Sequence, residues 1–382
     1  MQSLAQALYR HPAFLPHRLL SEIGLTRFWA QNAAVTTFAV VAPTLCAWRD
    51  RSFVIANGYG YLQHPGIFGW YLIQLIMPVA IYATLIAATR SSKHYRDVIT
   101  DASTFRFRKM VFNPMVTFVA FGNVASRSTF AFLFLAGFAA FAWNTFQNLS
   151  PGRLAPLDFW DSIHFPFGYF ASRVYKFYVD ALLLPSIVHI FTGIVWANIA
   201  ALRTLNKEKK VRLALFNPDK CGGFGFLADL ILSPTIWALL VSGLAFFGVV
   251  YTHRVFDVSM VTGILVQATI LIAFYVLPTF VLRSVLVQVK RFAAREVHAR
   301  QEAHYEAILS GRLHGAPLRE AHEYLRYFND IASTIDKIPN WPHLSKAYSA
   351  FGISISPALI SSIVSAVSTF MKLYPKLLPS LP

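Results

Sequence analysis

The sequence predicts an all-α, polytopic integral membrane protein with six transmembrane helices and a C-terminal cytoplasmic helical region. Of its 382 residues, 55% are hydrophobic and only 14% are charged, whereas soluble domains carry about 25% charged residues. A mean hydropathy of +0.48 agrees with this deficit. Apolar runs of about the 20 residues that cross a bilayer recur along the chain, and in lipid such runs form helices because backbone polar groups find no other partners.

Six apolar runs are expected to form the spans, at residues 28–48, 67–88, 129–147, 179–202, 231–251 and 260–282. They divide the chain into a cytoplasmic N-terminal lead-in (1–27), a six-helix transmembrane domain (28–282) and a cytoplasmic helical tail (283–382). The lead-in carries three arginines among prolines and aromatic residues. It lacks the order of a secretory signal, so we expect it to lie at the membrane surface.

The distribution of basic residues predicts the orientation. The lead-in, residues 89–128, residues 203–230 and the tail hold three, seven, six and twelve Lys and Arg, 28 in all, whereas the alternate loops hold six. Because cytoplasmic loops are the more basic ones, both termini are expected in the cytoplasm. Anionic lipid, rather than nucleic acid, is the expected partner of this charge. The excess of Arg over Lys is typical of a GC-rich bacterial genome, and the bacterial inner membrane is the expected location.

The tail is expected to contain two helices joined by a turn at residues 311–317. Apolar residues at alternating spacings of three and four form a seam on the second helix, which requires a partner helix from the same chain or from a neighbour. The seam consists of Leu318, Ala321, Leu325, Phe328, Ala332 and Ile335. Residues 353–371 are long enough to span, but a stripe of serines favours a helix lying in the interface. The irregularly spaced tail histidines favour solvated helix faces over a metal site.

Neutral polar residues occur within the predicted spans, and Asp, Glu, Lys and Arg occur only near their ends. This pattern argues against a proton pump or a carboxylate-coupled antiporter. His189 lies near the middle of the fourth span, where a hydrogen bond across a helix pair is the favoured interpretation and a pore lining is the alternative. The candidates for pore or helix-interface residues are Gln74, Asn144, His189, Thr192, Asn198 and Gln267. Prolines remove a helical hydrogen bond, and the candidate hinges are Pro78, Pro185 and Pro278.

The glycine-rich stretch LFNPDKCGGFGFL occupies residues 215–227. A phosphate-binding P-loop would need a following Lys-Ser/Thr, which is missing, and a metal site would need more ligands than Asp219 and Cys221. We therefore expect a turn that the Asn-Pro-Asp sequence initiates and the glycines allow to pack closely, a candidate hinge next to the membrane. An anion or ligand site is the alternative. The residues of this cytoplasmic loop are Asn217, Pro218, Asp219, Gly222, Gly223 and Gly225.

This loop resembles a His-Pro-Asp-x-x-Gly-Gly-x-Gly-Phe-Leu segment of an uncharacterised family of multi-pass bacterial inner-membrane proteins. Asn217 replaces the His of that segment, and the matching residues are Pro218, Asp219, Gly222, Gly223, Gly225, Phe226 and Leu227. The resemblance implies a multi-pass membrane protein and brings no activity with it. The tripeptide Phe-Asn-Pro also occurs at residues 112–114, 104 residues earlier, which would fit an ancient repeat of helical hairpins.

These features predict a channel or pore-like membrane protein, homo-oligomeric, that is gated or assembled through its cytoplasmic helices. The alternative is a membrane-anchored sensor or scaffold that recruits a soluble partner through its tail. The sequence lacks the Gly-x-Ser-x-Gly, His-Glu-x-x-His and P-loop patterns. His164 with Asp158 and Asp161 could bind a cation, but an aromatic interfacial belt explains that loop better. No enzyme activity, cofactor, metal or nucleic-acid partner is therefore expected.

Overall fold

The computed structural model describes residues 8–91 except 57 and 64, residues 112–149, residues 158–253 except 208–210, 216 and 218–220, and residues 269–340 except 271 and 312. Within these described residues, six stretches of helix are long and apolar enough to cross a membrane, and they are Phe28–Arg49, Tyr71–Ala88, Val124–Trp143, Pro166–Lys207, Gly225–Leu244 and Ile272–Leu309. The predicted fold class, an all-α polytopic membrane protein, is confirmed. Predicted features at Gln267 and at residues 353–371 lie outside the described residues.

The elements follow one another in a simple order. The first half contains η1 (Pro12–Phe14), α2 (Leu15–Glu22), α3 (Phe28–Arg49), β1 (Gly58–Tyr59), η2 (Tyr61–Gln63), α4 (Pro65–Ser91), α7 (Asn113–Val119) and α8 (Val124–Leu149). The second half contains β2 (Asp158–Phe159), α9 (Pro166–Phe177), the π-helical η4 (Tyr178–Leu183), α10 (Leu184–Lys207), α11 (Gly225–His253), the π-helical η5 (Ile272–Val276), α13 (Leu277–Leu309) and α14 (Ala316–Lys337). The two short strands pair in parallel, with Gly58 opposite Asp158.

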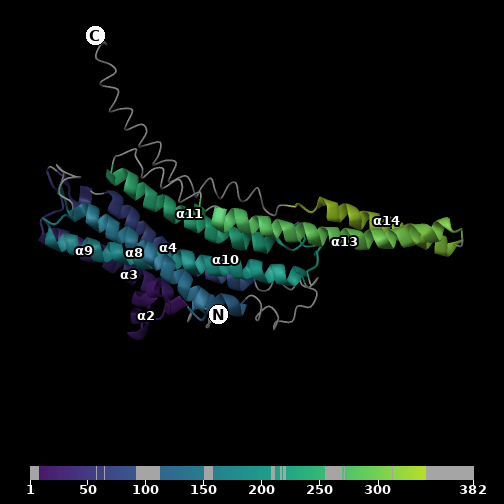
Figure 1. Ribbon diagram of the computed structural model, residues 1–382, viewed down its shortest axis with the longest axis horizontal. Helices are drawn as coiled ribbons and strands as arrows, with labels where there is room; N and C mark the ends of the chain where they lie inside the picture. The colour runs from purple at the N-terminus through teal and green to yellow at the C-terminus, as the bar shows by residue number, and fades with distance from the viewer. Residues whose placement is uncertain are drawn as a thin grey trace, which may run out of the picture.

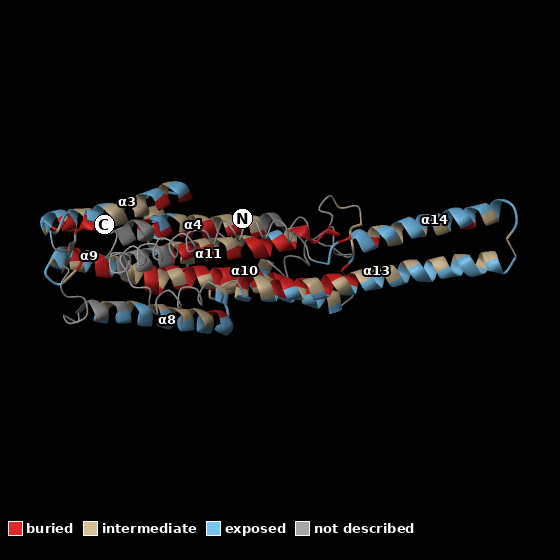
Figure 2. Cartoon of the chain, turned by 90° about the horizontal axis from the view of Figure 1, so that it is seen from above, coloured by how far each residue is buried: buried red, intermediate tan, exposed pale blue. Residues whose placement is uncertain are grey.

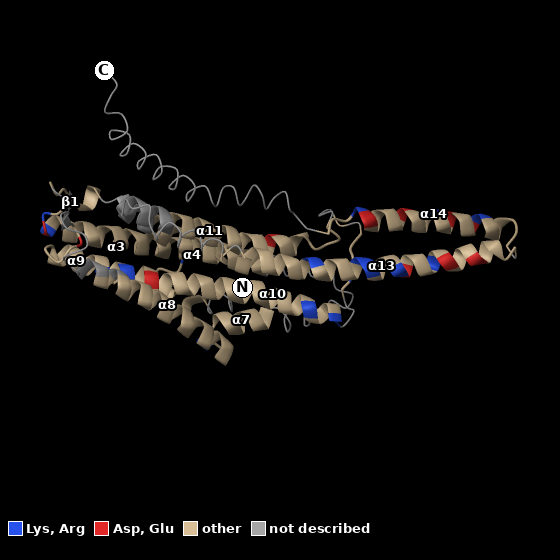
Figure 3. Ribbon diagram, turned by 45° about the horizontal axis from the view of Figure 1, so that its top comes forward, with Lys and Arg blue, Asp and Glu red and all other residues tan. Residues whose placement is uncertain are grey.

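The long helices run roughly along one axis, and the α13–α14 pair extends beyond the others as an arm (Figure 1). We call the end with β1 and β2 the loop end, and the opposite end, which carries the arm, the hairpin end. Charged residues on the helices concentrate towards these two ends and along the arm, while the middle of the bundle is almost free of them (Figure 3). This distribution is the one expected when the middle of the bundle lies in hydrocarbon.

The core lies between α4, α10, α11 and the first half of α13. Buried side chains there include Ile73, Met77, Ile81, Ile190, Phe191, Ile194 and Leu286. Two spans lie at the flanks (Figure 2), and they expose large apolar side chains such as Phe38 on α3 and Phe132 on α8. In a bilayer, packing rather than the hydrophobic effect holds helices together, so these exposed faces suit contact with lipid.

Glycines allow two close helix contacts. A Cβ on Gly137 of α8 would overlap the carbonyl oxygen of Asp180, and a Cβ on Gly193 of α10 would lie 2.5 Å from the Phe118 ring. Small residues at such positions let backbones approach, which is the usual way that transmembrane helices gain packing contacts.

The fourth span is longer than predicted. Helix is continuous from Pro166 to Lys207, 42 residues, or roughly 63 Å at 1.5 Å per residue, about twice the thickness of the hydrocarbon core. Arg173, Lys176 and Asp180 therefore lie within this helix. Arg173 and Lys176 precede the predicted span at residues 179–202 and Asp180 is its second residue, so the inference that charged residues occur only near the ends of the spans stays a prediction.

Two of the candidate hinge prolines follow a π-helical segment. Pro185 is the second residue of α10, directly after η4, and Pro278 is the second residue of α13, directly after η5. The wider π turn accommodates a residue that has no N–H to donate. Pro78 instead lies inside α4.

The arm is an antiparallel helical hairpin in which the predicted seam packs against α13. The seam residues form the least exposed face of α14. Across it, Gln301 donates to Asn329 at 2.8 Å and His304 stacks on Tyr324 with ring centroids 5.2 Å apart. At the base, Lys290 Nζ donates to the carbonyl oxygen of Ile338 at 2.7 Å. The partner helix that the seam requires is thus present in the same chain.

Candidate functional site

His189 belongs to a chain of four polar side chains that joins the N-terminal segment to α10 and the start of α8. Its Nδ1 lies 2.9 Å from His11 Nε2, and its Nε2 lies 3.0 Å from Ser126 Oγ and 3.1 Å from the Ser126 carbonyl oxygen. His11 Nδ1 lies 3.0 Å from Ser186 Oγ. All four residues are at most 1% exposed, so the network is closed to solvent.

The partners determine where each proton of this network lies. A carbonyl oxygen only accepts, so His189 donates from Nε2 to Ser126, and its Nδ1 accepts from His11 Nε2–H. His11 Nδ1 then accepts the Ser186 hydroxyl proton, and the Ser126 hydroxyl donates to the carbonyl oxygen of Phe118. Inferred in this way, both imidazoles are neutral and every polar hydrogen has an acceptor.

Aromatic rings enclose the two histidines. Phe118 stacks on His189 with centroids 4.5 Å apart, Phe121 stacks on its other side at 5.1 Å, and Phe130 meets both histidines edge-on. Burial lowers the pKa of His11 to about 3, and the adjoining His189 ring adds to this decrease. The apolar enclosure therefore keeps the His11 ring uncharged.

The N-terminal segment packs into the bundle instead of lying on the membrane surface as expected. Phe14 is fully buried, and Tyr178 donates to the carbonyl oxygen of Ala13 at 2.9 Å. His17 is also fully buried and stacks on Phe28. Burial lowers the pKa of His17 to about 4, and the Asn32 carboxamide, which approaches without completing a hydrogen bond, offsets a small part of that decrease.

The other polar candidates of the spans do not join this network. Gln74 donates from Nε2 to Val35 O at 3.5 Å, between α4 and α3, and its Oε1 is buried without a hydrogen-bond partner. Asn198 donates to Ile194 O on its own helix at 2.7 Å, and Thr192 is partly buried on α10. Asn144 lies on α8, but its side chain is outside the described set. Gln267 lies outside the described residues altogether. The described candidates therefore do not meet along one path.

A charged cluster at the loop end is a site that sequence reasoning missed. Asp161 Oδ2 accepts from Lys176 Nζ at 3.0 Å and from Ser172 Oγ at 2.8 Å, and it lies 3.5 Å from Arg173 Nη2. The Arg173 guanidinium also lies 4.9 Å from the centroid of the Tyr169 ring. Arg173 and Lys176 lie in the predicted outer loop before the fourth span, and Asp180 is the second residue of that predicted span. Their spacing of three and then four residues is helical.

Arg173 brings more hydrogen-bond donors to this cluster than the protein uses. Its residue is 8% exposed, and Nε, Nη1 and Nη2 have no hydrogen-bond partner among the described residues. Trp160 Nε1 and Ser162 Oγ, which flank Asp161 in the sequence, are also buried without a hydrogen-bond partner among the described residues. A buried donor without a partner costs about 1–3 kcal/mol, so this end of the bundle suits an acceptor such as water or a small anion. His164 lies in the turn before α9, and Asp158 lies in β2 with its side chain outside the described set.

The glycine loop forms a tight turn at the base of the arm. Gly222 and Gly223 have φ of +65° and +88°, a backbone region that only glycine adopts without strain. A Cβ on Gly222 would lie 2.8 Å from Leu213 Cδ2 and 3.5 Å from Ile338 Cδ1. The turn thus packs against the end of α14. Gly225 begins α11 and Asn217 precedes the turn, while Pro218 and Asp219 lie outside the described residues.

The asparagines of the two Phe-Asn-Pro segments differ in local structure. Asn113 is the first residue of α7, whereas Asn217 lies in a non-helical turn in which its N–H donates to Ala214 O at 3.1 Å. Among the described residues, no group of three or more His, Cys, Asp or Glu side chains is arranged to hold a metal ion.

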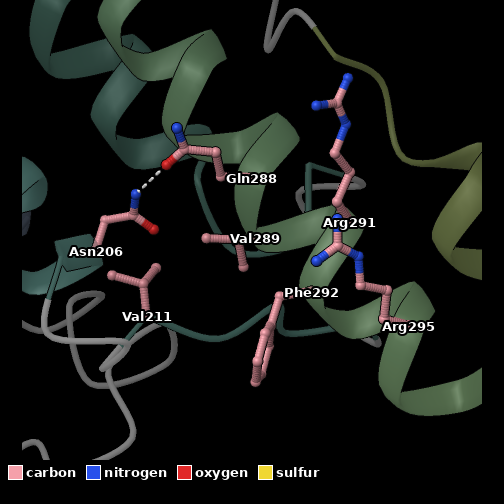
Figure 4. Close-up of a pocket in the computed structure, with 7 residues that line it drawn as sticks. All are labelled: Asn206, Val211, Gln288, Val289, Arg291, Phe292 and Arg295. Atoms are coloured by element: carbon pink, nitrogen blue, oxygen red, sulfur yellow. Dashed lines mark hydrogen bonds between the residues drawn. The ribbon is translucent and has the colours of Figure 1, made fainter. Parts of the chain in front are cut away.

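A pocket of about 300 Å³ lies between the C-terminal turn of α10 and α13. Figure 4 shows Asn206 and Gln288 at one side, where Asn206 Nδ2 donates to Gln288 Oε1 at 2.6 Å. Arg291, Phe292 and Arg295 line the other side. Guanidinium groups, a carboxamide pair and an exposed ring are groups that suit a small anion with a flat apolar part.

No protein-family model, curated protein or solved structure matches this chain. Its function must therefore be argued from its own geometry.

Proposed function

We propose that this chain is a membrane-anchored sensor or scaffold that recruits a soluble partner through the α13–α14 hairpin. The observation that carries the proposal is α13, whose 33 residues run without a break from the last span into the arm. A hydrogen-bonded helix moves as one body, so a change at its membrane end reaches the tip of the arm. The bias of basic residues favours the cytoplasm as the compartment of the hairpin.

The surface of the hairpin supports recruitment. Its seam is already occupied by α13, so a partner would use the remaining faces. Large aromatic and apolar side chains of the hairpin are more than half exposed, and they are Tyr305, Leu309, Tyr324 and Tyr327. Tyrosine is enriched at protein interfaces and among the residues that contribute most binding energy.

The junction at the base of the arm would couple the hairpin to the bundle. Ile338, at the end of α14, contacts the glycine turn before α11 and accepts the hydrogen bond of Lys290. A displacement of α11 against α13 would therefore act on both ends of the hairpin. In this proposal the spans detect a change in the membrane and the hairpin presents it to the partner.

Photocrosslinking in intact cells tests the proposal. A benzoylphenylalanine is placed at Tyr305, Tyr324 or Tyr327 in separate full-length variants, and at Phe132 on the exposed face of α8 as the control. We expect the hairpin positions to give one common adduct with a second, soluble protein and the Phe132 position to give none. Adducts only with a second copy of this chain, or no adduct, would refute recruitment.

A homo-oligomeric channel or pore-like protein, gated or assembled through its cytoplasmic helices, is the second candidate. Lys176 and Asp180 favour it, because ionisable residues in spans mark ion pathways. The prolines after the two π turns, Pro185 and Pro278, supply points where helices bend. Since the described polar candidates do not meet within one chain, such a pore would lie between copies.

Ion flux into proteoliposomes distinguishes the two candidates. A channel predicts flux through the wild type that changes in Asp180→Asn and not in Asp336→Asn, which alters an exposed carboxylate of the arm. Absence of flux from the wild type under changes of pH and membrane tension would eliminate the channel and leave recruitment unaffected.

A further inference from the structure

We propose that a groove between α2, α3 and α9 binds the acyl chain of a membrane phospholipid. The groove has a volume of about 770 Å³. Its walls are almost entirely apolar, and they include Leu19, Ile23, Val35, Phe38, Ala42 and Val174. This site is separate from the hairpin, and the inference does not depend on the function proposed above.

The position of the groove identifies the bilayer as the source of its occupant. α3 and the helix that begins with α9 are both spans. Side chains at the rim of the groove are more than half exposed, with Phe38 at 73%, Ile23 at 78% and Val174 at 54%. The groove therefore opens towards the hydrocarbon that surrounds the spans. An apolar space of this kind does not hold ordered water, so a lipid tail fills it.

Basic residues lie where the headgroup of such a lipid would be. Arg18 on α2 lies 3.9 Å from Glu22, which lines the groove, and both side chains are about half exposed or more. Arg27 directly precedes α3 and is exposed. An exposed ion pair contributes little stability, so Arg18 can exchange Glu22 for a phosphate at small cost. Phosphate oxygens are strong acceptors for guanidinium groups, and a phospholipid supplies both the phosphate and the tail.

The groove also contacts the network that holds the N-terminal segment. α2, which forms one wall, follows His11 by only a few residues, and Tyr178, which donates to Ala13, lines the groove. A tail in the groove would therefore contact α2 and support its position against α3. The bound lipid acts as a structural part of the N-terminal docking.

Native mass spectrometry of the full-length protein, with phosphatidylglycerol added, tests the assignment. We expect one phospholipid per chain to survive detergent removal in the wild type. Ala42→Trp fills the groove with an indole, and we expect it to reduce the lipid-bound fraction at least about tenfold, a difference of ~1.4 kcal/mol. Ala136→Trp, on the exposed face of α8, is the matched control and should retain the lipid. Equal retention by both variants would overturn the proposal.

A second measurement uses the wild-type groove and so does not depend on folding of a variant. Cys46 is a free cysteine that lines the groove, whereas the second cysteine, Cys221, is buried in the glycine turn. We expect a lipophilic maleimide to label Cys46 in delipidated protein and phosphatidylglycerol to slow this reaction at least about fivefold. A rate unaffected by lipid would refute the site. If the protection of Cys46 disappears on deletion of residues 1–7, or if it follows dimer formation, the groove is covered by this chain or by a second copy of it. Either result would also refute the lipid site.

Discussion

Two buried polar clusters lie along the same continuous helix and differ in how completely they are satisfied. The His189 network is neutral, and each of its donors has an acceptor. The Arg173 cluster is charged, and three guanidinium nitrogens have no hydrogen-bond partner in the part of the chain that the structure describes. A satisfied network rigidifies the elements that it joins, whereas spare buried donors are the feature of a place that accepts something from outside. The His189 network therefore has a structural role, and the Arg173 cluster is the stronger candidate for a ligand site.

Removal of the carboxylate should have the largest effect. In Asp161→Asn, Lys176 and Arg173 would face a neutral amide in a buried setting, and breaking a buried ion pair costs about 3 kcal/mol. Denaturant titration of the detergent-solubilised protein measures this loss in the free energy of unfolding. Glu296→Gln removes the exposed partner of Arg300 and should cost less than about 1 kcal/mol. Equal losses in the two variants would mean that the cluster is not buried in the folded protein.

Replacing either histidine of the His11–His189 pair should cause the next largest loss in the free energy of unfolding. His189→Phe fits the aromatic enclosure but leaves the His11 Nε2–H without an acceptor, which costs about 2 kcal/mol. His11→Phe should cost a similar amount. The double variant should cost clearly less than the sum, because contacting residues couple by about 0.5–3 kcal/mol. Additive losses in the same titration would contradict the direct bond between the two rings.

Acid should weaken the docking of the N-terminal segment. Unfolded histidine has a pKa of about 6.5, above the folded pKa values of about 3 for His11 and about 4 for His17. Docking is thus fully stable above pH 6.5 and loses stability as the pH falls towards those values, by about 2 kcal/mol for each ring at pH 5. Hydrogen exchange of residues 8–22, corrected for its intrinsic pH dependence, measures this change. Variants with His11 and His17 replaced by Gln should lose the dependence.

The glycine turn should show a smaller difference. Gly222 and Gly311 both have φ near +65°, so alanine strains either backbone by about 1 kcal/mol. Only at Gly222 would the new Cβ also meet Leu213 and Ile338, because nothing lies within 4 Å at Gly311. Gly222→Ala should therefore cost roughly 1 kcal/mol more than Gly311→Ala and alter the distance between spin labels on the arm and the bundle. An arm that keeps its position in both variants would exclude the turn as a hinge.

Loss of the arginine should have the smallest effect. Arg173→Met removes donors that have no partners and leaves Asp161 bound to Lys176 and Ser172. Removing buried donors that lack acceptors among the described residues relieves a cost of about 1–3 kcal/mol. This relief offsets the lost attraction between Arg173 and Asp161, so the free energy of unfolding should change by less than about 1 kcal/mol in the same titration. A loss comparable to that of Asp161→Asn would show that Arg173 is already satisfied, and the contrast between the two clusters would disappear.

Hydropathy predicted the six spans because every span must be apolar over about 20 residues, wherever it lies in the fold. The seam of α14 was also predictable from nearby sequence, since its partner helix, α13, directly precedes it in the chain. The contact between His11 and His189 joins residues 178 positions apart, and no local pattern announces it. α9 was missed because Pro166, the aromatic residues and the charges resemble an interfacial loop, although the spacing of Arg173, Lys176 and Asp180 is helical. The positive φ at Gly222 fits the turn that the glycines suggested, but its contact with Ile338 depends on how the arm folds back.

The length of α13 has a mechanical consequence. Its 33 residues extend roughly 50 Å at 1.5 Å per residue, and the π turn and Pro278 lie at the membrane end. A tilt of about 10° at that point would move the far end by roughly 9 Å, several times the displacement of the residues that pivot. The second helix, packed along the first, stiffens the lever against bending. A rearrangement too small to open a path through the bundle would thus become a large movement in the aqueous phase.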